Sequence, residues 1–251
     1  MNNRLLALIL FVLCIGTSSA QLVLTETLSS RTIDFSNTMQ NTVGWGPYTG
    51  VGFSPTTVAG RLNSNAWELK GWQNGDLAFG GAMSNPAHGR GAVTSAVITE
   101  GIYAYTDNPH TTANPAMLIQ PADGNFSPGS ITLRIRNNGT TNMTQLEVRY
   151  DLFVRNDEAA SSSFNFSHSN DNTAFIDEPG LDYVSPDAPD AFQWTQVDVS
   201  PSRSIIITGI NVLPGNFYYI RWSGDLVSGS GAQDEFGLDN IVVTGTYGPP
   251  A

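Results

Sequence analysis

The chain has 251 residues and carries 22 acidic residues against 11 lysines and arginines, a formal net charge of −11 at pH 7. This balance argues against nucleic acid or anionic lipid as a partner, because both favour surfaces rich in lysine and arginine. Cys14 is the only cysteine. A disulfide within the chain is therefore excluded, and a thiolate metal site is excluded as well if Cys14 is removed with an N-terminal signal.

Residues 1–20 are typical of a cleavable secretory signal peptide. Arg4 gives a basic start, residues 5–15 are an apolar run, and the segment ends in small residues at Ala20. The apolar run is shorter than the roughly 20 residues that a membrane-spanning helix needs. We predict a secreted or cell-surface protein with no membrane span after cleavage, and the alternative is a core helix or a retained anchor. Loss of Arg4 would change the net charge from −11 to −12.

The remaining residues, 21–251, show recurrent two-residue alternation and no sustained helical period. Such a pattern predicts a single all-β domain, a two-layer antiparallel β-sandwich of the jelly-roll type. The predicted strands are 22–28, 66–70, 92–105, 131–136, 146–155, 161–168, 192–199, 204–212, 217–222 and 238–244.

The two clearest strands are 131–136 and 146–155, and a turn-rich connection with Asn138-Gly139 lies between them. Asn-Gly is a strong signal for a tight turn, so we predict that the two strands form a hairpin. In that arrangement Arg149 and the arginines of the neighbouring run, Arg134 and Arg136, would make cross-strand ion pairs with Glu147 and Asp151.

Loop aromatics are the candidates for ligand contact. Trp72, Trp45 and Tyr48 lie in glycine-rich segments that read as loops, where binding residues tend to occur. Their rings could stack on sugars, because each presents an apolar face and a polar edge. Trp67 and Trp222 lie in strand-like segments and are predicted to be core residues.

The C-terminal stretch 225–239 surrounds a Gly/Ser loop with acidic residues, among them Asp225, Asp234 and Asp239. Oxygen-rich loops of this kind can hold Ca²⁺ through side-chain and backbone oxygens. The alternative is a solvated loop in which the aspartates accept backbone N–H groups.

Two resemblances follow from motifs in the chain. Leu238-Asp239-Asn240-Ile241 and Ile33-Asp34-Phe35 resemble the end and the start of MAM-type jelly-roll ectodomains, which implies a structural calcium site with Asp34 and Asp239 as ligands. Segments such as 67–71, 115–121, 128–133 and 221–225 are similar to secreted β-sandwich modules of Bacteroidetes and related bacteria, with features of carbohydrate-binding modules. This second resemblance implies a fold and a location, and it implies no agreed activity.

Three functions stay open at this point. The leading hypothesis is a non-catalytic extracellular recognition or adhesion module that binds polysaccharide or a cell-surface glycan, stabilised by Ca²⁺. The alternatives are a carbohydrate-active enzyme, a glycoside hydrolase or lyase, and a structural subunit of a surface layer or matrix. Glu147 and Asp151 share a strand face about 13 to 14 Å apart, too far for retaining glycosidase chemistry. His88, His110 and His168 show no zinc or triad spacing.

Overall fold

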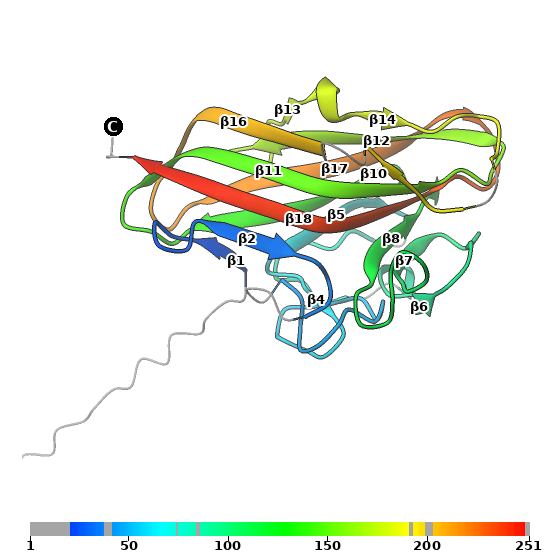
Figure 1. The fold of residues 1–251 in the computed structure, drawn as a ribbon, viewed down its shortest axis with the longest axis horizontal. Helices are drawn as coiled ribbons and strands as arrows, with labels where there is room; N and C mark the ends of the chain where they lie inside the picture. The colour runs from blue at the N-terminus through cyan, green and yellow to red at the C-terminus, as the bar shows by residue number, and fades with distance from the viewer. Residues whose placement is uncertain are drawn as a thin grey trace, which may run out of the picture.

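Two β-sheets of eight strands each lie face to face in the computed structural model (Figure 1). The structure describes residues 21–37, 42–73, 75–83, 86–190, 193–198 and 203–248. The predicted all-β sandwich is confirmed, while the predicted signal, residues 1–20, lies outside the described residues. Within the described ranges no helix has the length and apolar character needed to cross a membrane.

The first sheet has the central order β1-β10-β17-β12-β13, and β5, β9 and β14 pair with it at the sides. Its strands are β1 (Leu22–Leu24), β5 (Trp67–Trp72), β9 (Ala122–Asp123), β10 (Asn125–Asn137), β12 (Ala160–Ser169), β13 (Ile176–Asp177), β14 (Tyr183–Val184) and β17 (Phe217–Gly229).

The second sheet has the order β15-β11-β18-β8-β7-β6, with β16 beside β11 and β2 beside β18. Its strands are β2 (Ser30–Ile33), β6 (Ala92–Val93), β7 (Gly101–Tyr105), β8 (Ala116–Gln120), β11 (Asn142–Arg155), β15 (Thr195–Val197), β16 (Arg203–Val212) and β18 (Glu235–Gly248). The small pair β3 (Phe53–Ser54) and β4 (Leu62–Asn63) and the 3₁₀ turns η1 (Pro86–His88) and η2 (Pro179–Leu181) complete the described elements.

Aromatic side chains fill the space between the sheets. Tyr150 of the second sheet lies 5.5 Å from Trp222 and 5.8 Å from Phe166, ring centroid to ring centroid, and both partners belong to the first sheet. Phe164 and Phe236 make a similar contact at 4.9 Å. Each such ring removes about 150–250 Å² from water, roughly 4–6 kcal/mol of gross hydrophobic free energy at ~25 cal/mol per Å².

The predicted hairpin between residues 131–136 and 146–155 is wrong. Both strands form, as β10 and β11, but β10 pairs with β17 and β5 whereas β11 pairs with β18 and β16. Residues 138–141 therefore carry the chain from one sheet to the other. The predicted cross-strand ion pairs with Arg134 and Arg136 are also wrong, because Arg149 lies on the opposite sheet.

Two other predicted strands are each shorter or interrupted in the structure. Residues 22–28 give β1, which pairs in parallel with β10, and the chain then turns into β2 of the second sheet. Residues 92–105 form strand only at β6 and β7, and residues 94–100 run between them. The long strands pair antiparallel with one another as predicted, and each parallel pair includes a short strand.

Glu26 links the turn after β1, through hydrogen bonds, to the segment 138–141 that connects β10 with β11. One carboxylate oxygen accepts hydrogen bonds from the backbone N–H and the hydroxyl of both Thr140 and Thr141, at 2.8–3.1 Å. Its own backbone N–H and these donors lower the pKa of Glu26 to about 2. A Cβ added at Gly139 would lie 2.6 Å from Glu26 Oε2, which explains the glycine at this position.

Replacing Gly139 with alanine should lower the midpoint of thermal unfolding, because the new methyl group displaces the Glu26 carboxylate from its donors. In a Glu26→Ala background the same substitution should cost less, since the displaced contact is already gone. Circular dichroism melts of the two single variants and the double variant at pH 7 measure the coupling. Strictly additive losses would contradict this account of Gly139.

Candidate functional site

The outward face of the first sheet carries aromatic and arginine side chains on adjacent strands. Along β17 the side chains alternate: Tyr218, Ile220 and Trp222 are buried, whereas Phe217, Tyr219 and Arg221 are half-buried on the outer side. The register of β10 places Arg134 opposite Tyr219 and Arg136 opposite Phe217.

Arg134 is clamped between two phenyl rings. Its guanidinium carbon lies 4.6 Å from the ring centroids of both Phe79 and Phe217, and its Nε donates to the carbonyl of Asn65. Tyr219 closes the group, with its ring 5.9 Å from that of Phe79. We call Phe79, Arg134, Phe217 and Tyr219 the aromatic strip. Cation–π contact and the hydrogen bond hold these side chains in place before any ligand arrives.

A hollow of about 380 Å³ begins where the aromatic strip ends. It is lined by Asn170, Asn211, Val212, Gly215, Asn216, Phe217 and Tyr219, and we call it the asparagine hollow. All three asparagine side chains are exposed. A side-chain amide both donates and accepts hydrogen bonds, which suits hydroxyl groups. Ring faces beside amides are a combination that can bind a polyhydroxylated ligand.

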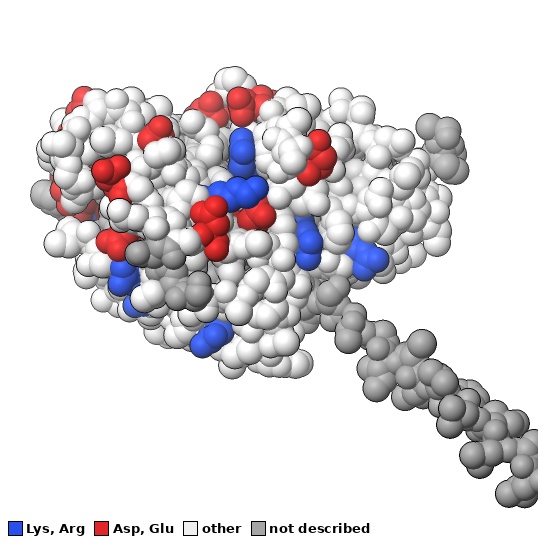
Figure 2. Space-filling model, turned by 180° about the vertical axis from the view of Figure 1, so that it is seen from behind, with Lys and Arg blue, Asp and Glu red and all other residues white. Residues whose placement is uncertain are grey.

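A second arginine stack lies farther along the same face. The Arg221 guanidinium carbon is 3.7 Å from the centroid of the Phe175 ring, and Arg221 Nε donates to Ser167 Oγ at 3.0 Å. Glu68 pairs with Lys70 at 3.1 Å. Figure 2 shows the molecule from this side: basic side chains extend from the middle of the face toward the right, with acidic side chains beside them in the middle and others above and to the left.

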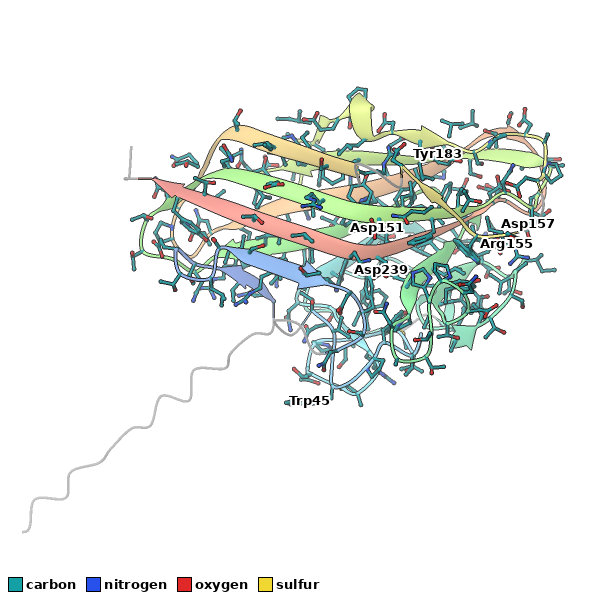
Figure 3. All side chains as sticks on the ribbon, in the orientation of Figure 1. Trp45, Asp151, Arg155, Asp157, Tyr183 and Asp239 are labelled. Carbon is teal, nitrogen blue, oxygen red and sulfur yellow. The ribbon has the colours of Figure 1, made fainter. Side chains whose placement is uncertain are left out.

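The structure places the three predicted ligand residues apart from this face. Trp72 is the last residue of β5 and 4% exposed, packed against His88 and Phe126, so its assignment to a loop is wrong. Tyr48 is 1% exposed and packs on Phe35, so neither ring is available for stacking. Trp45 is 66% exposed at the tip of the lower loops in Figure 3, and its ligand role stays a prediction.

The four predicted calcium ligands have separate partners. Asp34 accepts from the backbone N–H of Ser36, Asp225 from that of Leu226, and Asp234 from that of Glu158. Asp239 is buried and contacts His110 Nε2 at 3.2 Å. Among the residues that the structure describes, no three His, Cys, Asp or Glu side chains are grouped to hold a metal ion. The calcium assignment stays a prediction.

A buried acid network links the start of β18 to the loop that covers the outer face of the second sheet. Glu235 Oε1 accepts the backbone N–H of Val97 at 2.9 Å, and Asp157 pairs with Arg155 Nε at 3.0 Å (Figure 3). Burial raises the pKa of Glu235, and the hydrogen bond and charge of Asp157 raise it further. Burial likewise raises the pKa of Asp234 to about 6. The network stabilises the loop that contains Val97, at a distance from the asparagine hollow.

Sequence reasoning missed the aromatic strip, although part of its signal was present. The segment 217–222 alternates between two sets of side chains, and the set with Phe217, Tyr219 and Arg221 contains two aromatic residues and an arginine. Strand alternation alone places that set on one face. The contribution of Phe79 had no local signal, because it comes from a segment outside the predicted strands.

No protein-family model and no curated protein matches the chain. Several solved structures align with low similarity. A carbohydrate-binding module described as specific for non-crystalline cellulose aligns over 56% of this chain and 78% of its own, with 12% identity and a TM-score of 0.35. The CBM22-1 xylan-binding domain from Paenibacillus barcinonensis aligns over 59% and 81%, with 8% identity and a TM-score of 0.32. A family 35 carbohydrate-binding module from Clostridium thermocellum aligns over 57% and 86%, with 15% identity and a TM-score of 0.29.

Glu235→Gln should remove part of the alkaline loss of stability. A carboxyl group whose pKa is raised by folding contributes stability that is full below its unfolded-state pKa and is lost as the pH rises through the folded-state value. Glutamine keeps an acceptor for Val97 and cannot ionise. We expect the melting midpoint of the variant to match the wild type near pH 4.5 and to exceed it at pH 8 to 9. Glu147→Gln on the same sheet is the matched control. Parallel pH profiles for wild type and Glu235→Gln would refute this role.

Proposed function

We propose that the protein is an extracellular recognition module that binds polysaccharide on the outer face of its first sheet. The observation that carries the proposal is the junction of the aromatic strip with the asparagine hollow. There two aromatic residues, Phe217 and Tyr219, border a cavity lined by three exposed asparagines. Export follows from the signal peptide predicted at residues 1–20 and forms part of the proposal.

The chemistry of the site matches a sugar in two respects. The C–H face of a sugar ring is apolar and packs on an aromatic ring, while its hydroxyls need partners that donate and accept. Phe217 and Tyr219 offer the first kind of surface, and Asn170, Asn211 and Asn216 offer the second.

The lining supports binding rather than hydrolysis. Glycosidases of the usual kind need two carboxyl groups on either side of the scissile bond. The described residues that line the asparagine hollow include no aspartate or glutamate. Recognition without cleavage is therefore the function that this geometry favours.

Tyr219→Ala should weaken binding to a responsive oligosaccharide roughly tenfold or more, as expected for removal of a central aromatic contact. Asn216→Ala should also weaken binding, whereas Asn114→Ala, an exposed asparagine outside the hollow, should not. Isothermal titration against a polysaccharide panel measures the three affinities, and circular dichroism confirms folding. If Trp45→Ala loses binding while Tyr219→Ala keeps the wild-type affinity, the binding site lies at the Trp45 loop instead. Release of reducing or unsaturated sugar ends from a polysaccharide would show that the protein is a carbohydrate-active enzyme and would contradict recognition without cleavage.

Structural calcium is the second part of the proposal that comes from the sequence. A cation bound only by the folded state must raise the melting temperature. We therefore expect a chelator to lower the melting midpoint and added Ca²⁺ to restore it, with Asp239→Asn abolishing the response. A midpoint unmoved by both additions would rule out the predicted site.

A further inference from the structure

Three arginines on the outer face of the first sheet make no direct ion pair. Within the described residues no carboxylate lies within ion-pair distance of Arg134, Arg136 or Arg221, although Lys70, Arg90, Arg155 and Arg203 each have one. The chain contains twice as many acidic as basic residues, 22 against 11. Among the described residues Arg31, Arg61 and Arg149 also make no ion pair. Arg134, Arg136 and Arg221 differ from them in lying together on the outer face of the first sheet.

The three guanidinium groups are held in a common way. Arg134 Nε donates to the carbonyl of Asn65, Arg136 Nε to the carbonyl of Gly215 at 3.3 Å, and Arg221 Nε to Ser167 Oγ at 3.0 Å. No Nη nitrogen of the three donates to a residue that the structure describes. The protein thus orients each side chain through Nε and leaves the terminal nitrogens for another acceptor.

We propose that this face binds an acidic polysaccharide, a chain of sugars that carry carboxylate groups, with Arg136 and Arg221 as its carboxylate ligands. The inference rests on the proposed function and names its ligand class. A planar guanidinium group binds a carboxylate through paired, charge-assisted hydrogen bonds. The aromatic strip and the asparagine hollow bind the ring faces and hydroxyls of the same chain.

The positions of the arginines favour a ligand longer than one sugar. Thr132 of β10 lies opposite Arg221, and Arg136 is four residues farther along β10. At the usual rise of a strand the two backbone positions are about 14 Å apart along the sheet. Backbone positions this far apart favour contacts with separate sugars of one chain, so binding should strengthen from monosaccharide to oligosaccharide.

The net negative charge of the protein does not prevent such binding. Interactions between exposed charges are screened beyond about 8 Å at physiological ionic strength. A carboxylate in contact with Arg136 or Arg221 therefore responds mainly to that arginine. Burial lowers the pKa of Arg134 and of Arg221, while the nearby carboxylates of Glu68 and Asp177 raise it in part. Burial therefore leaves both positive charges incompletely solvated, and each would gain from a further anionic partner in direct contact.

The test uses one backbone in two charge states: oligogalacturonates and the same oligomers with their carboxylates methyl-esterified. We expect the wild-type protein to bind the acidic form more tightly, with an affinity that falls as sodium chloride is added. Arg136→Gln and Arg221→Gln should each weaken binding of the acidic form roughly tenfold and leave binding of the ester nearly unchanged. Arg136→Lys and Arg221→Lys should recover part of the loss, since lysine keeps the charge without the fork.

Arg149→Gln is the matched control, because Arg149 is an exposed arginine on the outer face of the other sheet that forms no ion pair with the residues that the structure describes. Thermal melts establish that each variant folds. Equal binding of acid and ester would overturn the acidic ligand class and leave the proposed function standing. If sulfated glycans or single-stranded nucleic acid bind as tightly as the oligogalacturonates do, the site is a nonspecific anion-binding surface, and that result would also overturn the inference. If acidic, esterified and neutral oligomers all fail to bind, the proposed function itself would be refuted.

Discussion

The contact of Tyr150 with Phe166 and Trp222 is the constraint on which the rest of the structure depends. It joins the two sheets through buried rings in a chain that has no disulfide to do so. Because side chains alternate along a strand, fixing Trp222 inside also fixes Tyr219 and Arg221 outside. A slip of one residue would place Trp222 in solvent and the arginine in the core. The outer face is therefore specified by the same packing that closes the sandwich.

The sequence predicted where the long strands run more reliably than how they pair. Alternation marks residues 131–136 and 146–155 as strands, because it depends only on neighbours in the chain. It does not tell which sheet receives each strand. The Asn138-Gly139 turn fits a hairpin and fits an inter-sheet crossover equally well, and here the crossover is held by Glu26, far away in sequence. The pairing of β10 with β17 and β1 depends on contacts between segments far apart in the sequence, and local alternation carries no information about such contacts.

The site was harder to predict than the fold, for a related reason. Glycine-rich surroundings suggested that Trp72 and Tyr48 lie in exposed loops, but short-range composition does not report tertiary burial, and both rings lie in the core. The aromatic strip combines Phe79, Arg134 and Tyr219 from three separate segments. Alternation alone could have placed the strand residues on one face. No local pattern could have shown that Phe79 folds over them.

Stacking on phenyl rings explains how the chain keeps positive charge on this face. An arginine that packs on a carboxylate is neutralised by it, as Arg155 is by Asp157. Arg134 and Arg221 are instead supported by ring faces and single hydrogen bonds through Nε. A ring quadrupole stabilises a cation without cancelling its charge. The arrangement therefore orders the guanidinium groups and preserves their attraction for an anion, which a carboxylate partner from within the protein would have removed.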